Sequence, residues 1–288
     1  MKDYVILTDS CCDLSAGMAE ELELEVLPLS FLMEGKEYFN HLDYRDIAAK
    51  DFYSRVRGGA LGTTSAINVA VFTEAMTELV NQGKDVLCIA FSSGLSTTYQ
   101  SAAIAASEVM SAHPGSKVLV CDSRAASLGQ GLLVYLAVQE KRKGKSLEEL
   151  RDFVEERKNH ICHWFTVDDL NHLKRGGRVS AAAALLGTML QMKPVLHVDG
   201  EGRLIPVSKV RGRKASVNAL LEKMAELAED PSVVFISHGD CEAEAVALGE
   251  AVKARFPVEK LVINYVGPVI GNHSGPGTLA LFFQGKHK

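Results

Sequence analysis

Short apolar segments alternate with helical segments along this chain, and this alternation limits the possible folds more than any other feature of the sequence. Apolar runs without polar alternation are typical of strands buried on both faces of a parallel sheet, and helices supply the cover. The first half therefore predicts a parallel sheet with helices on both sides. The apolar runs occupy residues 4–8, 24–29, 85–91 and 117–121, and helical patterns occupy residues 101–111, 128–143 and 147–158, the last with a Ser146/Glu149 capping box.

The pattern changes near residue 160. Two expected strands, 194–198 and 204–210, flank a DGEG sequence that is typical of a hairpin turn. The segment 181–192 is apolar nearly all round and predicts a buried helix. We therefore expect an N-terminal α/β domain (1–160) and a C-terminal mixed α/β domain (161–288), with a ligand tunnel between and within them. The other expected elements are strands at 162–167, 233–238, 260–266 and 279–283 and helices at 214–228 and 242–256.

Composition excludes several classes of protein. The 288 residues carry a net charge of -5, whereas nucleic-acid binding domains usually carry a clustered basic excess. No apolar run reaches the roughly 18 residues that span a bilayer, and the N-terminus enters a predicted strand without a signal peptide. The six cysteines show no C-x-x-C spacing, although Cys11 and Cys12 are adjacent and either form a reactive pair or are ordinary loop thiols. A cytoplasmic protein with free thiols is expected.

Four segments are rich in hydroxyl groups, glycine or histidine. Residues 8–14 (TDSCCDL) follow the first strand, where open α/β sheets bind ligands. Residues 62–66 (GTTSA) predict an anion-binding turn, and residues 91–100 (FSSGLSTTYQ) lie before a helix whose N-terminus attracts anions. Residues 267–277 predict a Gly-Pro loop around His273, which can bind an anion, act as an acid or base, or close the turn. In each case, ordinary helix capping or turn formation is the alternative.

Common catalytic motifs are missing from the sequence. It contains no phosphate-binding G-x-x-x-x-G-K-[ST], no dinucleotide-binding G-x-G-x-x-G and no clustered Cys/His metal site. Residues 94–98 (GLSTT) fail the last position of a G-x-S-x-G nucleophile motif. Carboxylates are plentiful, but no two of them are expected to form a pair near the hydroxyl-rich segments. We therefore expect no catalytic residue, cofactor or metal, and instead a set of donors for an anion.

Taken together, the segments form an ordered series that resembles the DegV family of fatty-acid-binding proteins. The resemblance extends from the first expected strand to the last. The series comprises TDS and DL in 8–14, TS at 64–65, SSGLS and YQSA in 92–102, DS at 122–123, GQG at 129–131, LKRGGR at 173–178, KPVL at 193–196, RGR at 211–213, and GP, G and HSGPG in 267–277.

The resemblance implies a two-domain DegV-like α/β fold in which a long acyl chain lies in an apolar tunnel. It also implies that the protein presents the fatty acid carboxyl group to a separate ATP-binding subunit of a bacterial fatty acid kinase, which forms an acyl phosphate. The apolar segment 181–192 is expected either to line the tunnel or to be ordinary core. By family motif, Thr64, Ser93 and His273 would contact the carboxyl group, Ser65, Ser92 and Ser96 would lie close by, and Arg175, Arg178 and Arg211 would meet the kinase subunit or the phosphate.

Two positions depart from the family pattern. Thr97 stands where the hydroxyl-rich loop usually has glycine, which predicts a reshaped headgroup site. Residues 66–68 (AIN) replace a more common Gln-Pro-Ser, which removes a rigid proline. The alternatives are a stand-alone hydrolase or transferase that uses Ser93 and His273, a binder of small polyols through covalent attachment to His273, and a regulatory lipid sensor.

Overall fold

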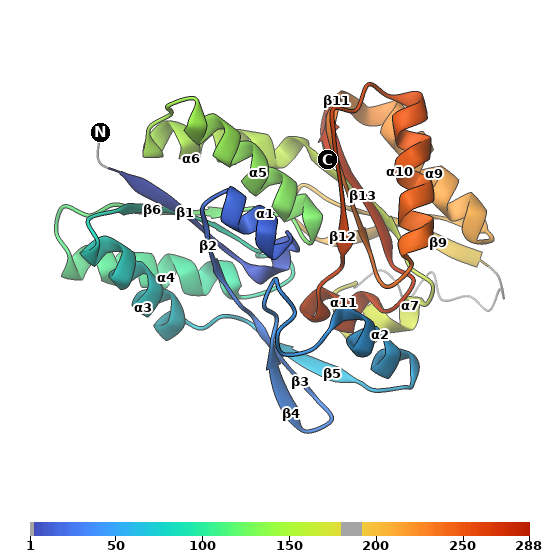
Figure 1. Ribbon diagram of the computed structural model, residues 1–288, viewed down its shortest axis with the longest axis horizontal. Coiled ribbons are helices and arrows are strands. Elements are labelled where there is room, and N and C mark those ends of the chain that lie inside the picture. Colours follow the sequence, from blue (N-terminus) through green and yellow to red (C-terminus); the bar gives the residue numbers. More distant parts are fainter. Residues whose placement is uncertain (1–2, 180–191) are drawn as a thin grey trace.

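The strands of the first half form a parallel four-stranded sheet in the order β2-β1-β6-β7. The computed structural model describes residues 3–179 and 192–288 (Figure 1). The predicted parallel sheet is confirmed, because each apolar run overlaps one of its strands. These strands are β1 (Tyr4–Asp9), β2 (Leu24–Leu27), β6 (Asp85–Ala90) and β7 (Val118–Asp122).

Helices cover both faces of this sheet. Along β1, Val5 and Leu7 belong to a core cluster with α3 and α4, whereas Ile6 belongs to the opposite cluster with α5 and α6. Figure 1 shows these two helix pairs on opposite sides of the strands. The predicted capping box is present at the start of α6, with Ser146 and Glu149 bonded reciprocally. The helices of this half are α1 (Ala16–Glu21), α2 (Ala49–Arg57), α3 (Val69–Asn81), α4 (Thr98–Ala112), α5 (Leu128–Arg142) and α6 (Leu147–Arg157).

The second half forms a six-stranded mixed sheet in the order β10-β9-β8-β13-β11-β12. Strands β11 and β12 run parallel, while the predicted β9–β10 hairpin is antiparallel, as are the pairs that involve β13 and β8. Helices α9 (Arg213–Leu227) and α10 (Glu242–Arg255) pack on one face of this sheet. The strands are β8 (Ile161–Thr166), β9 (Met192–Val198), β10 (Leu204–Arg211), β11 (Ala228–His238), β12 (Lys260–Tyr265) and β13 (Leu279–Gly285).

Helix α5 is the element that joins the two sheets. Its buried Leu132 belongs to the same core cluster as Ile6 of the parallel sheet and Phe235 and Phe282 of the mixed sheet. A fully buried leucine or phenylalanine contributes about 1.5–3 kcal/mol by leaving water, so this shared layer fixes the two halves against each other. The N-terminus of α5, at Leu128, therefore lies close to the strands of both halves.

A third sheet, which the sequence analysis did not predict, lies at the junction of the halves. Its antiparallel strands β3 (Ser30–Met33), β4 (Lys36–Phe39) and β5 (Gly62–Ser65) have the order β4-β3-β5. The short helix α11 (Pro268–Ser274) contacts β3, β5, α2 and α7 (Leu170–Arg175). Figure 1 shows the small sheet projecting beside α2 and α11.

Two sequence-based predictions are wrong at this junction. Residues 62–65 form β5 and not an anion-binding turn, because backbone pairing with β3 extends them. Residues 268–274 form helix α11 within the predicted Gly-Pro loop, since Pro268 at the first helical position fits the fixed proline φ. The predicted apolar helix at 181–192 lies outside the described residues, apart from Met192, which begins β9. Within the described ranges, no helix is long and apolar enough to cross a bilayer.

Candidate functional site

A cavity of about 470 Å³ lies where the three sheets meet. Its wall contains Thr64 of β5, the loop that follows β6, His273 of α11 and residues of β8, β11 and β13. This volume falls within the 300–1,000 Å³ that is usual for small-molecule sites. Much of the lining is apolar and includes Leu29, Phe91, Leu95, Phe165, Val266 and Phe282.

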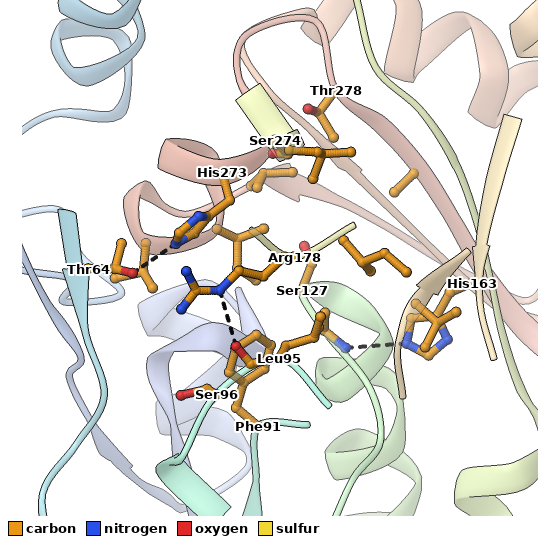
Figure 2. Close-up of a pocket in the computed structure, with 18 of the residues that line it drawn as sticks. Thr64, Phe91, Leu95, Ser96, Ser127, His163, Arg178, His273, Ser274 and Thr278 are labelled. Carbon is orange, nitrogen blue, oxygen red and sulfur yellow. Dashed lines mark hydrogen bonds between the residues drawn. The ribbon is translucent and has the colours of Figure 1, made fainter. Parts of the chain in front are cut away.

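The small sheet and α11 bring Thr64 and His273 together from positions 209 residues apart. Thr64 is held in β5 opposite Phe31 of β3, and His273 lies in the last turn of α11. The Thr64 Oγ1 and His273 Nε2 atoms are 2.8 Å apart (Figure 2). Ser65, the next residue of β5, also lines the cavity. One wall of the cavity therefore carries a hydrogen-bonded pair made of the Thr64 hydroxyl and the His273 imidazole.

His273 is neutral near pH 7. Burial, reinforced by the positive charge of Arg178, lowers the pKa of His273 from 6.5 to about 4. A neutral imidazole can either donate or accept at Nε2, depending on its tautomer. The Thr64 hydroxyl hydrogen can therefore point to His273, or His273 can donate to Thr64 and leave that hydrogen free for a ligand.

Ser93 on the facing loop has a different partner. Its hydroxyl donates to Asp122 Oδ2 over 2.5 Å, and its backbone N–H donates to Asp122 Oδ1 over 3.1 Å. Ser93 lies shortly after the end of β6, and Asp122 is the last residue of β7. The carboxyl ends of these neighbouring parallel strands lie at the same edge of the sheet. Asp122 therefore holds both the hydroxyl and the backbone N–H of Ser93. Asp122 was not predicted as a site residue, although its position at the end of a strand could have indicated it.

The other serines of this loop mainly shape the backbone. Ser92 is fully buried, is absent from the cavity lining, and donates to the Gly202 carbonyl over 2.8 Å. Ser96 and Thr97 line the cavity, and Ser96 Oγ lies 2.8 Å from the Thr98 hydroxyl at the start of α4. Gly202 has φ +75°, and a Cβ atom at this position would lie only 2.1 Å from Ser92 Oγ, so the close contact requires glycine there.

The three predicted arginines occupy different surroundings. Arg178 lines the cavity, and its guanidinium donates to the Leu95 carbonyl from Nε and to the Gly176 carbonyl from Nη1 (Figure 2). Arg175 is exposed at the end of α7, with Nη2 2.9 Å from His172 Nδ1. Arg211 is exposed at the end of β10, and neither Arg175 nor Arg211 belongs to the cavity lining. The structure therefore brings Arg178 to the Thr64–His273 end and leaves the other two outside it.

The segment 8–14 lies behind the cavity wall and does not line it. Buried Asp9 accepts hydrogen bonds from the Phe91 and Cys11 backbones, and its burial raises its pKa to about 6. Asp13 accepts a bond from Ser127, a cavity residue that the sequence analysis missed. Cys11 and Cys12 are buried free thiols whose pKa is raised by burial, which argues against a reactive pair.

A second buried histidine, His163 of β8, lines a more apolar part of the cavity. Its Nδ1 lies 2.9 Å from the Ile161 carbonyl, and the Ala126 N–H donates to its Nε2 over 3.4 Å (Figure 2). Burial holds the pKa of His163 well below its usual value, so the ring is neutral. Across residues 3–179 and 192–288, no group of three or more His, Cys, Asp or Glu side chains is arranged to hold a metal ion.

Comparison with known proteins gives consistent matches over nearly the whole chain. The model of the DegV family, described as uncharacterised proteins, matches residues 3–286. A DegV domain-containing protein of Clostridium perfringens is 44% identical over 290 residues, spanning 100% of this chain and 99% of that protein.

Two solved structures from other bacteria share the fold. A DegV family protein from Thermus thermophilus, reported for its fatty acid binding, is 34% identical, covers 99% of this chain and 100% of its own, and has a TM-score of 0.89. DegV of Bacillus subtilis, a fatty acid binding protein, is 31% identical, with coverage of 99% and 100% and a TM-score of 0.85.

Proposed function

The chain belongs to the DegV family, and on this premise we propose that it binds a long-chain fatty acid in the cavity. The observation that carries the proposal is a largely apolar cavity with hydrogen-bonding groups from Thr64, Ser93, Arg178 and His273 in its wall. The homologous proteins of T. thermophilus and B. subtilis are fatty acid binding proteins, which supports the same ligand class. We also propose that 1–160 and 161–288 are the two domains that enclose the ligand.

The acyl tail sets the affinity in this proposal. About 14 methylenes at about 0.8 kcal/mol each offer on the order of 11 kcal/mol before costs. Ordering the chain and immobilising the ligand consume much of that free energy. One headgroup hydrogen bond contributes about 1–3 kcal/mol, so the polar residues orient the ligand more than they hold it.

The carboxyl group would lie at the Thr64–His273 end. When Nε2 of the neutral His273 donates to Thr64 Oγ1, the Thr64 hydroxyl hydrogen is free for the carboxylate, and Arg178 supplies positive charge nearby. Ser65 follows Thr64 in β5 and Ser96 lies on the facing loop, and both line the cavity, whereas Ser92 acts by fixing the loop backbone. Ser93 contributes a hydrogen bond when its hydroxyl turns from Asp122 to the ligand.

We further propose that a separate ATP-binding kinase subunit phosphorylates the bound carboxylate. A carboxylate oxygen attacks the γ-phosphorus of ATP, the bond to the β–γ bridging oxygen breaks, and ADP leaves with the electron pair while an acyl phosphate remains. Exposed Arg175 and Arg211 are then candidates for contacts with the kinase subunit, and Arg178 for contact with the phosphate. The chain acts as the substrate-presenting subunit and uses no catalytic side chain of its own.

The hydrogen-bond pattern is less suited to the hydrolase alternative. A serine nucleophile needs a base that accepts its proton, but Ser93 donates to Asp122 while His273 bonds Thr64. Across the described ranges, no hydrogen bond joins Ser93 to His273. The apolar lining also fits a lipid better than a polyol.

Mass spectrometry of the purified protein, first native and then denatured, tests the proposal. We expect one fatty acid per chain, recoverable by solvent extraction. Absence of lipid, together with no uptake from a fatty acid mixture, would refute fatty acid binding. Addition of a kinase subunit and ATP to the loaded protein then tests presentation, with acyl phosphate as the expected product and no turnover as the contrary result.

A further inference from the structure

A chain of three buried polar side chains reaches the cavity wall away from Thr64 and His273. Asp13, Ser127 and Ser237 are at most 5% exposed. Ser127 Oγ lies 2.6 Å from Asp13 Oδ2 and 2.9 Å from Ser237 Oγ. Both serines line the cavity, and in Figure 2 Ser127 lies between the Thr64–His273 pair and His163. We call these three residues the Asp13 chain.

The Asp13 chain leaves hydrogen-bonding capacity at the cavity. A serine hydroxyl has one hydrogen, so when Ser127 donates to Asp13, Ser237 must donate to Ser127. Ser237 Oγ then keeps its lone pairs for an outside donor. Burial raises the pKa of Asp13 to about 8, and a protonated Asp13 reverses the order, so that Ser237 keeps its hydrogen for an outside acceptor. In both protonation states of Asp13, the free hydrogen-bonding capacity belongs to the hydroxyl of Ser237, which lines the cavity.

The backbone of Ser127 is strained. Its φ of 54° and ψ of -146° lie in a region that residues other than glycine rarely adopt. Such conformations persist where the surrounding structure enforces them, and they cluster at ligand sites. Here the conformation places the Ser127 hydroxyl between Asp13 and Ser237.

A further hydroxyl in the same cavity has no hydrogen-bond partner in the part of the chain that the structure describes. Ser274 is 4% exposed and lines the cavity, and its Oγ has no hydrogen bond within the described residues (Figure 2). Burying a polar group without a hydrogen bond is costly, and a cavity meant for plain alkyl chains would be more stable with apolar walls. An orphan hydroxyl therefore indicates a polar group on the ligand.

A purely structural role explains part of this arrangement. The Asp13 chain connects the two halves, but Asn264 already does so by donating to the Asp13 carbonyl over 2.8 Å. A structural link also gives no reason for its hydroxyls to line a cavity, for strain at Ser127, or for a Ser274 hydroxyl that has no partner among residues 3–179 and 192–288. These three observations all indicate that a polar group of a ligand binds in this part of the cavity.

We propose that the Asp13 chain is a subsite for a hydroxyl group on the acyl chain, so that the cavity accepts monohydroxylated long-chain fatty acids. The ligand hydroxyl exchanges a hydrogen bond with Ser237 Oγ. The inference rests on the proposed fatty acid binding and extends it to a class of oxygenated ligand.

Competition binding with stearate and a positional series of monohydroxy C18 acids tests the subsite. The variants are Ser237→Ala, which removes the terminal hydroxyl, and Ser127→Gly, which removes the middle hydroxyl and relieves the strained φ. Ser216→Ala is the matched control, because Ser216 is also fully buried and bonded, to the Arg213 carbonyl, but does not line the cavity. Thermal unfolding of each variant reports its folding.

We expect at least one hydroxy isomer to bind the wild-type protein as tightly as stearate does. Its affinity relative to stearate should fall about tenfold in both subsite variants and stay unchanged in Ser216→Ala. Weaker binding of every isomer to the wild-type protein, or a preference unaffected by Ser237→Ala, would overturn the inference. Stearate binding separately reports the proposed function: if a hydroxy acid binds and stearate does not, the subsite stands and binding of plain fatty acids fails. If neither binds, both fail.

Discussion

The two walls at the headgroup end of the cavity hold their hydroxyls in opposite ways. On the wall made by β5 and α11, Thr64 bonds a neutral histidine that can act as donor or acceptor. On the wall made by the ends of β6 and β7, Ser93 donates to Asp122, and an ionised carboxylate only accepts. The first wall is ready to offer a hydrogen to an anion, whereas the second must give up an existing bond. Identical chemical groups therefore have different availability because their partners differ.

Loss of the Thr64 hydroxyl from the β5–α11 wall should have the strongest consequence for function. Thr64→Val keeps a β-branched side chain in β5 but removes the hydroxyl that orients the carboxylate, so we expect acyl phosphate formation with a partner kinase to fall by about two to three orders of magnitude. Fatty acid should remain bound, because the tail dominates affinity. Turnover by fatty-acid-loaded protein with saturating kinase subunit measures the effect. Thr64→Ser should restore most of the rate, and an unchanged rate in Thr64→Val would remove Thr64 from the site.

The histidine of the same wall should control part of the pH dependence of stability. The pKa of His273 is about 4 in the folded protein, against an ordinary value of 6.5, so protonation favours the unfolded chain. The stability from this lowered pKa is present above pH 6.5 and is lost as the pH falls towards 4. Its full size is about 3 kcal/mol.

Urea unfolding of the unliganded protein between about pH 7.5 and pH 4 measures this contribution. Wild type should lose up to about 3 kcal/mol more than His273→Gln over that range. Asp13, whose pKa is raised to about 8, has the opposite sign and loses stability as pH rises, but it is present in both proteins and cancels in the difference. Parallel pH profiles would show that the pKa of His273 is not lowered.

The substitution Asp122→Asn should release the Ser93 hydroxyl on the second wall for the ligand. The asparagine oxygen can still accept from the Ser93 and Arg124 backbones, while its amide donates to Ser93 Oγ. The Ser93 hydrogen is then free for the ligand carboxylate, and a nearby negative charge is gone. We expect fatty acid affinity to rise about tenfold. Calorimetric titration of delipidated protein measures it, with Ser93→Ala/Asp122→Asn as the control that should lose the gain; weaker binding in Asp122→Asn would contradict this account of the wall.

A change at the start of α3 should lower the stability of the protein without changing its affinity for fatty acid. Asn68 caps α3 by accepting from the Val71 N–H over 3.0 Å, three residues beyond the end of β5. Asn68→Ala should cost about 1 kcal/mol of unfolding free energy. Affinity for fatty acid should not change, because Asn68 does not line the cavity. A large loss of affinity would instead mean that α3 positions the Thr64 wall.

Local patterns predicted the larger part of the fold. Continuous apolar runs indicated the parallel sheet, the DGEG turn indicated the β9–β10 hairpin, and Ser146 with Glu149 indicated the start of α6. The short strands of the third sheet escaped prediction because four residues hold too few side chains to show a period, and GTTS is polar. Its existence depends on pairing with β3, which no local pattern contains.

Local sequence patterns already indicate which segments are buried and which hydroxyl-rich motifs follow them, since the period of apolar residues depends on neighbouring residues. The partners of those hydroxyls were decided by tertiary structure: Thr64 meets His273 across 209 positions, and Asp13 meets Ser127 across 114. Packing of α5 between two sheets and of α11 against β5 creates these pairs. A hydrogen bond depends on distances of a few tenths of an ångström, and only the assembled core fixes those distances between residues so far apart in the chain.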